Sequence, residues 1–165
     1  MARRPIEIER KWLVEYPPVL SGHKGAKIIQ GYIAVSPDGT EVRLRREDEK
    51  FFMTTKTGTG LQRGEIEIEL SREQFRSLWP ATQGRRLEKV RYTLKWRRKE
   101  IELDIYRKKL AGLKVAEVEF TSRKQAANFS PPEWFGKEIT EDEEYKNVNL
   151  AKRKETKNVD DGALH

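Results

Sequence analysis

Apolar and polar residues alternate along most of the chain, and this period of two is typical of β-strands with two different faces. The first clear stretch is residues 5–14, where Ile6, Ile8 and Trp12 alternate with charged residues. Turn signals such as Pro37-Asp38-Gly39 separate the stretches. The predicted strands are residues 5–14, 27–35, 41–46, 51–56, 63–70, 87–96, 100–107 and 113–121.

Helical signals are few and short. Ser71, with Gln74 three residues later, predicts a helix that begins with a capping box, and Thr140 with Glu143 predicts another. The predicted helices are residues 73–79, residues 122–128 and a last helix that begins at the Thr140 cap. Eight short strands and so little helix indicate a mainly β (α+β) fold, either an antiparallel barrel or a sandwich.

Composition narrows the function classes. The 165 residues include 34 Lys and Arg against 27 Asp and Glu, a net charge of +7 that favours anionic partners. There is no cysteine, which excludes disulfides, thiolate zinc sites and a cysteine nucleophile. No run approaches the roughly 18 apolar residues of a membrane span, and the arginines near the N-terminus precede no apolar stretch. We therefore expect a cytoplasmic protein without a membrane partner.

The chain shows no repeat and no linker that would divide it. We expect one domain over residues 1–151 and a charged, flexible tail over residues 152–165. The sequence does not set the oligomeric state, and a homodimer is left open.

The polar faces of the predicted strands are almost purely charged. Residues two apart on a strand share a face, so many like charges lie side by side, which is locally unfavourable. The acidic pairs are Glu7 and Glu9, Glu65 and Glu67, Glu102 and Asp104, and Glu117 and Glu119. The basic positions are Lys11, Arg43 and Arg45, Lys56, Arg63, and Lys89 and Arg91.

Two interpretations of these charges differ in what lies against them. A solvated sheet face would screen the like charges, whereas a water-filled cavity would need ligands to balance them. Like pairs on six different strands favour the cavity. Paired carboxylates suit Mg²⁺ or Mn²⁺, and Arg and Lys suit phosphoryl oxygens. The pattern predicts phosphoryl transfer, which rests on positioning and electrostatics and needs no protein nucleophile.

The same residues resemble the CYTH superfamily, the triphosphate tunnel metalloenzymes, over about residues 5–151. Glu7-Ile-Glu9-Arg-Lys11 looks like the ExExK signature of that family. Further similar motifs follow in order: Gln30-Gly-Tyr32, Arg43-Leu-Arg45, Lys56, Arg63-Gly-Glu65-Ile-Glu67, Glu88-Lys89-Val-Arg91-Tyr92, Glu102-Leu-Asp104, Glu117-Val-Glu119 and Tyr145-Lys-Asn147.

The resemblance implies an eight-stranded antiparallel closed tunnel barrel with a few peripheral helices, which hydrolyses triphosphates with two Mg²⁺ or Mn²⁺ ions. It assigns phosphate binding to Lys11, Arg43, Arg45, Lys56, Arg63, Lys89 and Arg91. It assigns metal binding to Glu7, Glu9, Glu65, Glu67, Asp104, Glu117 and Glu119. The implied catalytic residues are Lys11, Tyr32, Lys89 and Glu67.

Activities diverge within that family, and the short loops favour inorganic tripolyphosphate as the substrate. Nucleoside or thiamine triphosphatase and class IV adenylate cyclase remain alternatives. A non-enzymatic barrel that binds polyphosphate or RNA is a second alternative, because basic clusters occur at residues 95–99, 107–109 and 152–157. The acidic strand faces would repel a nucleic-acid backbone, so we do not expect nucleic acid as the partner.

Overall fold

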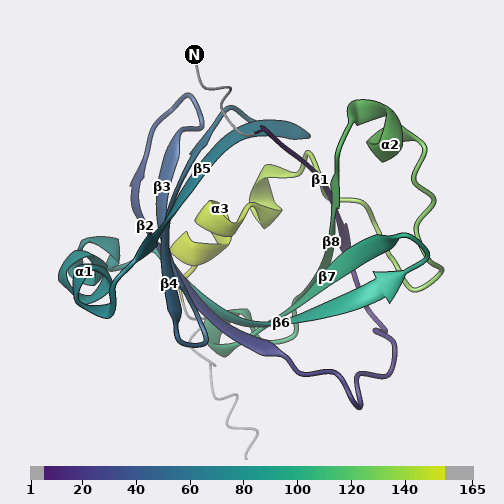
Figure 1. The fold of residues 1–165 in the computed structure, drawn as a ribbon, viewed down its shortest axis with the longest axis horizontal. Helices are drawn as coiled ribbons and strands as arrows, with labels where there is room; N and C mark the ends of the chain where they lie inside the picture. Colours follow the sequence, from purple (N-terminus) through teal and green to yellow (C-terminus); the bar gives the residue numbers. More distant parts are fainter. Residues whose placement is uncertain (1–5, 155–165) are drawn as a thin grey trace, which may run out of the picture.

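The chain forms a closed antiparallel barrel in the computed structural model, which describes residues 6–154. The strands follow one another around the barrel in the order β1-β5-β4-β3-β2-β6-β7-β8 (Figure 1). Their bounds are β1 Ile6–Leu13, β2 Ala26–Val35, β3 Glu41–Glu47, β4 Lys50–Thr57, β5 Gln62–Leu70, β6 Arg86–Trp96, β7 Lys99–Tyr106 and β8 Lys114–Phe120. The predicted strands and the tunnel barrel are thus confirmed, with differences only at strand ends.

Two of the predicted helices are present on the outside of the barrel. Helix α1 (Arg72–Leu78) begins with the expected capping box of Ser71 and Gln74. A 3-10 turn, η1 (Trp79–Thr82), follows it directly, and α2 (Arg123–Ala127) packs near β1 and β8. A further 3-10 turn, η2 (Lys108–Leu110), joins β7 to β8. No helix within residues 6–154 is long and apolar enough to cross a membrane.

The prediction of a helix capped by Thr140 is wrong. The Thr140 hydroxyl accepts the backbone N–H of Lys11, and the backbone N–H of Ile139 bonds to the Lys11 carbonyl, so this segment pairs with β1. The chain then forms a 3-10 turn, η3 (Glu143–Tyr145), and a short helix, α3 (Asn147–Lys152). Helix α3 thus ends at the residue where the tail was expected to begin, and residues 155–165 lie outside the described part.

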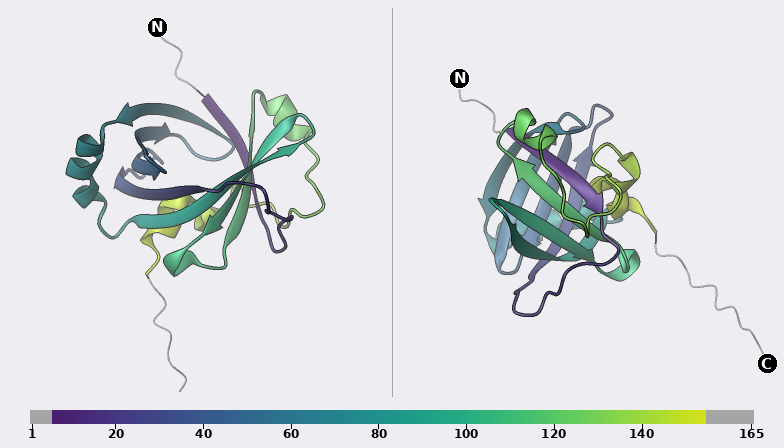
Figure 2. Two further views of the ribbon diagram at one scale, coloured as in Figure 1. Left: turned by 60° about the horizontal axis from the view of Figure 1, so that its bottom comes forward. Right: turned by 90° about the vertical axis from the view of Figure 1, so that its right-hand side faces the viewer.

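Helix α3 lies across one end of the barrel (Figures 1 and 2). It contacts β2 and β6. Its Val148 and Leu150 are buried in one cluster with Tyr32, Leu87 and Tyr106. This apolar cluster closes the barrel at the α3 end.

Most other apolar residues pack on the outer face of the wall. Trp12 packs there against Phe129 and Phe135, and Phe51 packs against Phe75 of α1, with ring centroids 5.0 Å apart. Because neighbouring strand residues face opposite sides, this arrangement turns the charged positions inward.

Strand β1 is paired over different lengths with its two neighbours in the barrel wall. Strand β1 pairs with β8 over six registered positions, from Ile8 with Phe120 to Leu13 with Val115. It pairs with β5 over only three positions, the last at Ile6 with Gly64. In the described part of the chain, β5 beyond Gly64 is therefore hydrogen-bonded only to β4.

Candidate active site

The barrel encloses a polar cavity of ≈ 450 Å³. Its wall gathers side chains from every strand, as the inward-facing charges predict. The predicted site residues that line it are Glu7, Glu9, Lys11, Arg43, Arg45, Lys56, Glu65, Glu67, Lys89, Arg91, Glu117 and Glu119.

Three predicted site residues lie outside this lining. Asp104 is fully buried beneath the cavity wall, and Tyr32 is 1% exposed within the cluster at the α3 end. Arg63 lines a smaller adjoining pocket and binds Glu41 and the carbonyl of Gly39. In this structure the three side chains therefore contact residues around the cavity rather than the cavity itself.

Three polar lining residues received no role from the sequence, and the apolar Ile6 completes the lining. Glu102 belongs to the acidic ladder, and Gln30 and Asn147 belong to motifs noted above, so each carried a signal. Asn147 comes from α3, and its Oδ1 accepts the Tyr106 hydroxyl at 2.5 Å. The sequence could not place Asn147 in the tunnel, because its position depends on α3 crossing the barrel end.

Acids and bases interleave where β1 meets its neighbours. The register places Glu9 opposite Glu119 and Lys11 opposite Glu117. Lys11 Nζ lies 3.3 Å from Glu9 and 3.4 Å from Glu117. The Lys56 ammonium donates to Glu7 at 2.9 Å, from β4 to β1 past the intervening β5. Each lysine balances carboxylates that would otherwise repel one another.

A second group of charges centres on Asp104 of β7. Lys89 Nζ donates to Asp104 at 2.6 Å, and Arg91 donates two hydrogen bonds to the same carboxylate. The other guanidinium contacts of Arg91 are with Glu102 at 2.6 Å and Glu117 at 3.1 Å. Asp104 thus holds both basic residues of β6 at the cavity wall.

A third group joins β3, β4 and β5 through a threonine. Thr54 is opposite Arg43 on one side and opposite Glu67 on the other. Its hydroxyl accepts from Arg43 at 3.3 Å and donates to Glu67 at 2.6 Å. Arg45 also donates to Glu67, at 3.2 Å.

The carboxylates of the site differ in acidity. Burial, together with the charge of Glu117, raises the pKa of Glu9 to about 7. Burial likewise raises the pKa of Glu102 to about 7, although Arg91 opposes it. For Glu117, burial acts in the same direction, but Lys11 and Arg91 outweigh it and hold the pKa well below its usual range. The site therefore combines a firmly ionised carboxylate with neighbours whose charge lacks full compensation.

The donor chemistry of this wall fits a hard divalent cation. Glu117 Oε1 is buried and accepts no hydrogen bond, although it forms an ion pair with Lys11 at 3.4 Å. Glu9 and Glu119 are opposite each other in the strand register as like charges. Carboxylate oxygens are the ligands that Mg²⁺ and Mn²⁺ prefer. No three acidic or histidine side chains within residues 6–154 are already gathered as a metal site. Binding would exchange the lysine partners of these carboxylates for a cation.

The contacts of Tyr32 and Lys89 bear on the expected catalytic pair. The Tyr32 hydroxyl accepts from Gln30 at 3.0 Å, and burial raises the pKa of this phenol to about 12. Lys89 binds Asp104 and lies over the Tyr106 ring at 5.5 Å. Burial lowers the pKa of Lys89, although Asp104 opposes it.

The fold and the site define a class of protein, a barrel that carries a charged tunnel. Comparison with known proteins identifies this class. The CYTH domain family matches residues 5–154, and the chain belongs to that family. It is 47% identical over 146 residues to an inorganic triphosphatase of Nitrosomonas europaea, covering 88% of this chain and 96% of that protein.

Two further comparisons agree with this assignment. An inorganic triphosphatase of Acetivibrio thermocellus is 35% identical over 148 residues, covering 88% of this chain and 93% of that protein. A solved structure of an inorganic triphosphatase superposes with a TM-score of 0.68 at 42% identity, covering 91% of this chain and 97% of the other. The family resemblance and the barrel fold expected from the sequence are thereby confirmed.

Proposed function

We propose that the protein is a metal-dependent hydrolase that removes the terminal phosphoryl group of inorganic tripolyphosphate inside its barrel. The observation that carries this proposal is the interleaving of acids and bases around one cavity of ≈ 450 Å³. Such a wall suits a polyanion that arrives with cations, because the anion and the cations can each replace one half of the existing ion pairs. The inorganic triphosphatases among its relatives support the same substrate.

The basic residues would hold the phosphate chain. Arg43 and Arg45 lie side by side on β3, and Arg91 projects from β6 toward the same cavity. Guanidinium groups bind phosphoryl oxygens in a fixed two-pronged geometry, whereas Lys11 and Lys56 act as compact point charges. On substrate entry, each of these bases would exchange a carboxylate partner for a phosphoryl oxygen.

Glu7, Glu9, Glu117 and Glu119 would hold one metal ion, and Glu65 and Glu67 a second. Asp104 supports the site indirectly, because it is buried and bound to Lys89 and Arg91. When bound, Mg²⁺ or Mn²⁺ draws charge from the phosphate chain and makes water more acidic. Glu67, held by Thr54 and Arg45, is the carboxylate best placed to orient that water.

Lys89 and Lys11 would act as catalytic cations. Both approach the cavity from fixed positions, Lys89 against Asp104 and Lys11 between Glu9 and Glu117. Each would stabilise negative charge that develops on the phosphoryl oxygens. Tyr32 would assist indirectly, since its hydroxyl accepts a hydrogen bond from Gln30, which lines the cavity.

The direct test is phosphate release from tripolyphosphate, with ATP and pyrophosphate alongside, in Mg²⁺, in Mn²⁺ and in EDTA. We expect metal-dependent release from tripolyphosphate and its loss by at least about 100-fold in Glu9→Gln. The matched control is Glu133→Gln on the exposed surface, which removes the same charge and should leave the rate unchanged.

Three outcomes would count against the proposal. Turnover that persists in EDTA would exclude the metal role. A preference for ATP would move the assignment toward nucleotide chemistry. Absence of turnover in either metal, from folded protein, would leave a binding module as the better account.

A further inference from the structure

A second basic surface lies outside the barrel, at the C-terminal end of α3. It is a groove of ≈ 720 Å³ whose lining includes the apolar residues Ile29, Trp79 and Leu87. Seven bases and a single acid, Glu88, surround it. The bases, which we call the groove bases, are Arg86, Arg107, Lys108, Lys109, Lys152, Arg153 and Lys154.

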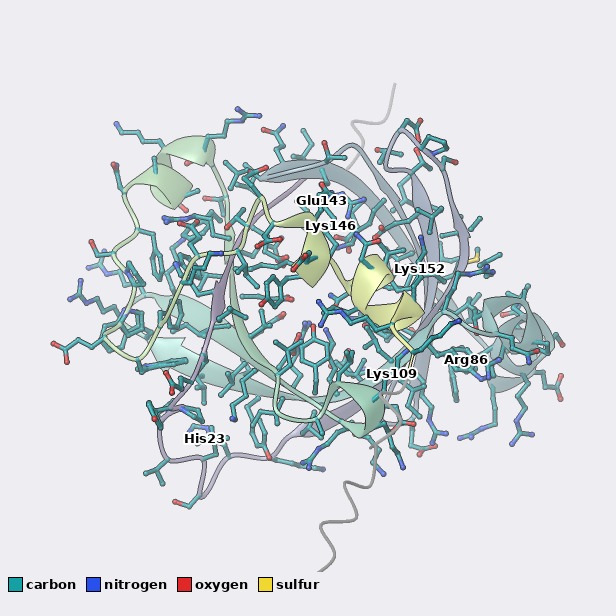
Figure 3. The ribbon with its side chains drawn as sticks, turned by 180° about the vertical axis from the view of Figure 1, so that it is seen from behind. His23, Arg86, Lys109, Glu143, Lys146 and Lys152 are labelled. Atoms are coloured by element: carbon teal, nitrogen blue, oxygen red, sulfur yellow. The ribbon has the colours of Figure 1, made fainter. Side chains whose placement is uncertain are left out.

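The groove is separate from the tunnel. Helix α3 connects the two, because Asn147 at its start lines the tunnel and Lys152 at its end lines the groove. Figure 3 shows Arg86, Lys109 and Lys152 gathered near this end of α3. No residue lines both cavities.

The groove differs from the tunnel in how its charges are balanced. Every base that lines the tunnel forms an ion pair with a carboxylate, and Lys89 and Arg91 share Asp104. By contrast, Arg107, Lys108, Lys152 and Lys154 pair with no acidic side chain within residues 6–154. Their like charges face one groove without compensation, which attracts a polyanion.

Two of the groove bases are held by hydrogen bonds to backbone carbonyl groups. Lys109 donates to the carbonyl of Ala151 at 2.6 Å, and Arg153 donates to the carbonyl of Glu144. A carbonyl oxygen is neutral, so the bond from Arg153 positions this cation without neutralising it. The backbone of Lys108 adopts φ of 56°, in the left-handed region that residues with a side chain seldom occupy.

The aromatic surface of the groove limits what kind of polyanion fits. Arg86 lies over the Trp79 ring at 4.6 Å, and Phe75 stacks on Trp79 with ring centroids 5.0 Å apart. The indole ring of Trp79 thus already has a guanidinium group and an aromatic ring as partners. Single-stranded nucleic acid gains much of its affinity by stacking bases on free aromatic rings, and the ring of Trp79 is already engaged.

We propose that this groove is a binding site for inorganic polyphosphate, a chain of phosphates without bases. The groove gathers seven bases, of which Arg107, Lys108, Lys152 and Lys154 pair with no acidic side chain within residues 6–154, and its aromatic residue, Trp79, already has partners for its ring. The site would bind polyphosphate independently of hydrolysis in the tunnel.

The test measures binding of long-chain inorganic polyphosphate by calorimetry in EDTA, with excess tripolyphosphate present to occupy the tunnel. The groove variant is Arg107→Glu/Lys152→Glu/Lys154→Glu, three exposed positions. The matched control is Lys95→Glu/Arg98→Glu/Lys124→Glu, exposed positions on another basic surface with the same change in charge. Both variants keep the residues of the tunnel, so hydrolysis of tripolyphosphate should remain at the level of the unmodified protein.

We expect the dissociation constant to rise at least about tenfold in the groove variant and by less than about twofold in the control. An equal loss in both variants would overturn the proposal, since only net charge would then matter. Unchanged binding in the groove variant would overturn it as well. Single-stranded RNA that binds the groove as tightly as polyphosphate would overturn the assignment of a ligand without bases.

Discussion

Lys89 and Asp104 form an ion pair that is closed to solvent. Their charged atoms lie 2.6 Å apart, and the side chains are 2% and 0% exposed. Arg91 binds the same carboxylate from the cavity side. One buried acid thus sets the position of two bases that face the tunnel.

Removing the charge of Asp104 should therefore affect stability as well as activity. We expect Asp104→Asn to lower the free energy of unfolding by about 3 kcal/mol, because Lys89 would be left as a buried, uncompensated charge. Urea denaturation measures the change. Glu102→Gln is the control, since its side chain is 40% exposed and the substitution should change the free energy of unfolding by less than about 1 kcal/mol in either direction. Equal effects of the two substitutions would contradict the anchoring role of Asp104.

Thr54 should act as a positioning residue for Glu67. Thr54→Val keeps the shape of the side chain but removes the hydroxyl that joins Arg43 to Glu67, and we expect kcat to fall about tenfold or more with a smaller change in KM. Thr54→Ser should restore most of the rate, because it restores the hydroxyl. Failure of Thr54→Ser to recover activity would show that packing, rather than the hydrogen bonds, matters at this position.

The pKa of Glu9 gives the protein a pH-dependent stability in the absence of metal. Because this pKa rises from 4.5 to about 7 on folding, Glu9 stays protonated up to a higher pH in the folded state than in the unfolded state. Ionisation of Glu9 over this window therefore destabilises the fold, and Glu102 acts in the same direction. The free energy of unfolding in EDTA should decrease between about pH 5 and about pH 7.5.

The variant Glu9→Gln separates this effect from general titration. Its free energy of unfolding should depend less steeply on pH, because glutamine does not ionise. Glu117 contributes the opposite sign, but its pKa lies well below the usual range, so its effect falls at more acidic pH. An unchanged slope in Glu9→Gln would contradict the assignment to Glu9.

The capping box of α1 should contribute measurably to stability. Ser71→Ala removes the side-chain oxygen that accepts the backbone N–H of Gln74, and we expect a loss of about 1 kcal/mol. Ser77→Ala in the same helix is the control, since Ser77 is exposed and makes no cap. Thermal denaturation of both variants would measure the difference, and equal melting temperatures would refute it.

The strands and their inward charges could be predicted because both follow from a local period of two. The same period could not reveal depth along the tunnel. Glu102 and Asp104 share a face, yet Glu102 lines the cavity and Asp104 is sealed beneath Lys89 and Arg91. That difference depends on the neighbouring strand β6, which the sequence of β7 does not contain.

The start of the last helix could not be predicted from the sequence for a related reason. Thr140 has the residue type and spacing of a helix cap, but its hydroxyl is already bound by the backbone of Lys11. A contact across 129 positions of the chain cannot be read from a local motif. The sequence did not predict Asn147 in the tunnel lining, because its position also depends on the path of the chain after Thr140.

Within residues 6–154, the short seam between β1 and β5 leaves residues 65–69 of β5 without a hydrogen-bonded strand on that side. An edge of this kind invites the strand of another molecule to add to it. Glu65, Glu67 and Glu69 alternate along this edge with Ile66 and Ile68, which are each 48% exposed. A second copy pairing there in register would bring its own glutamates against these. Glu65 and Glu67, which line the tunnel, would thus also oppose the pairing of two copies along this edge.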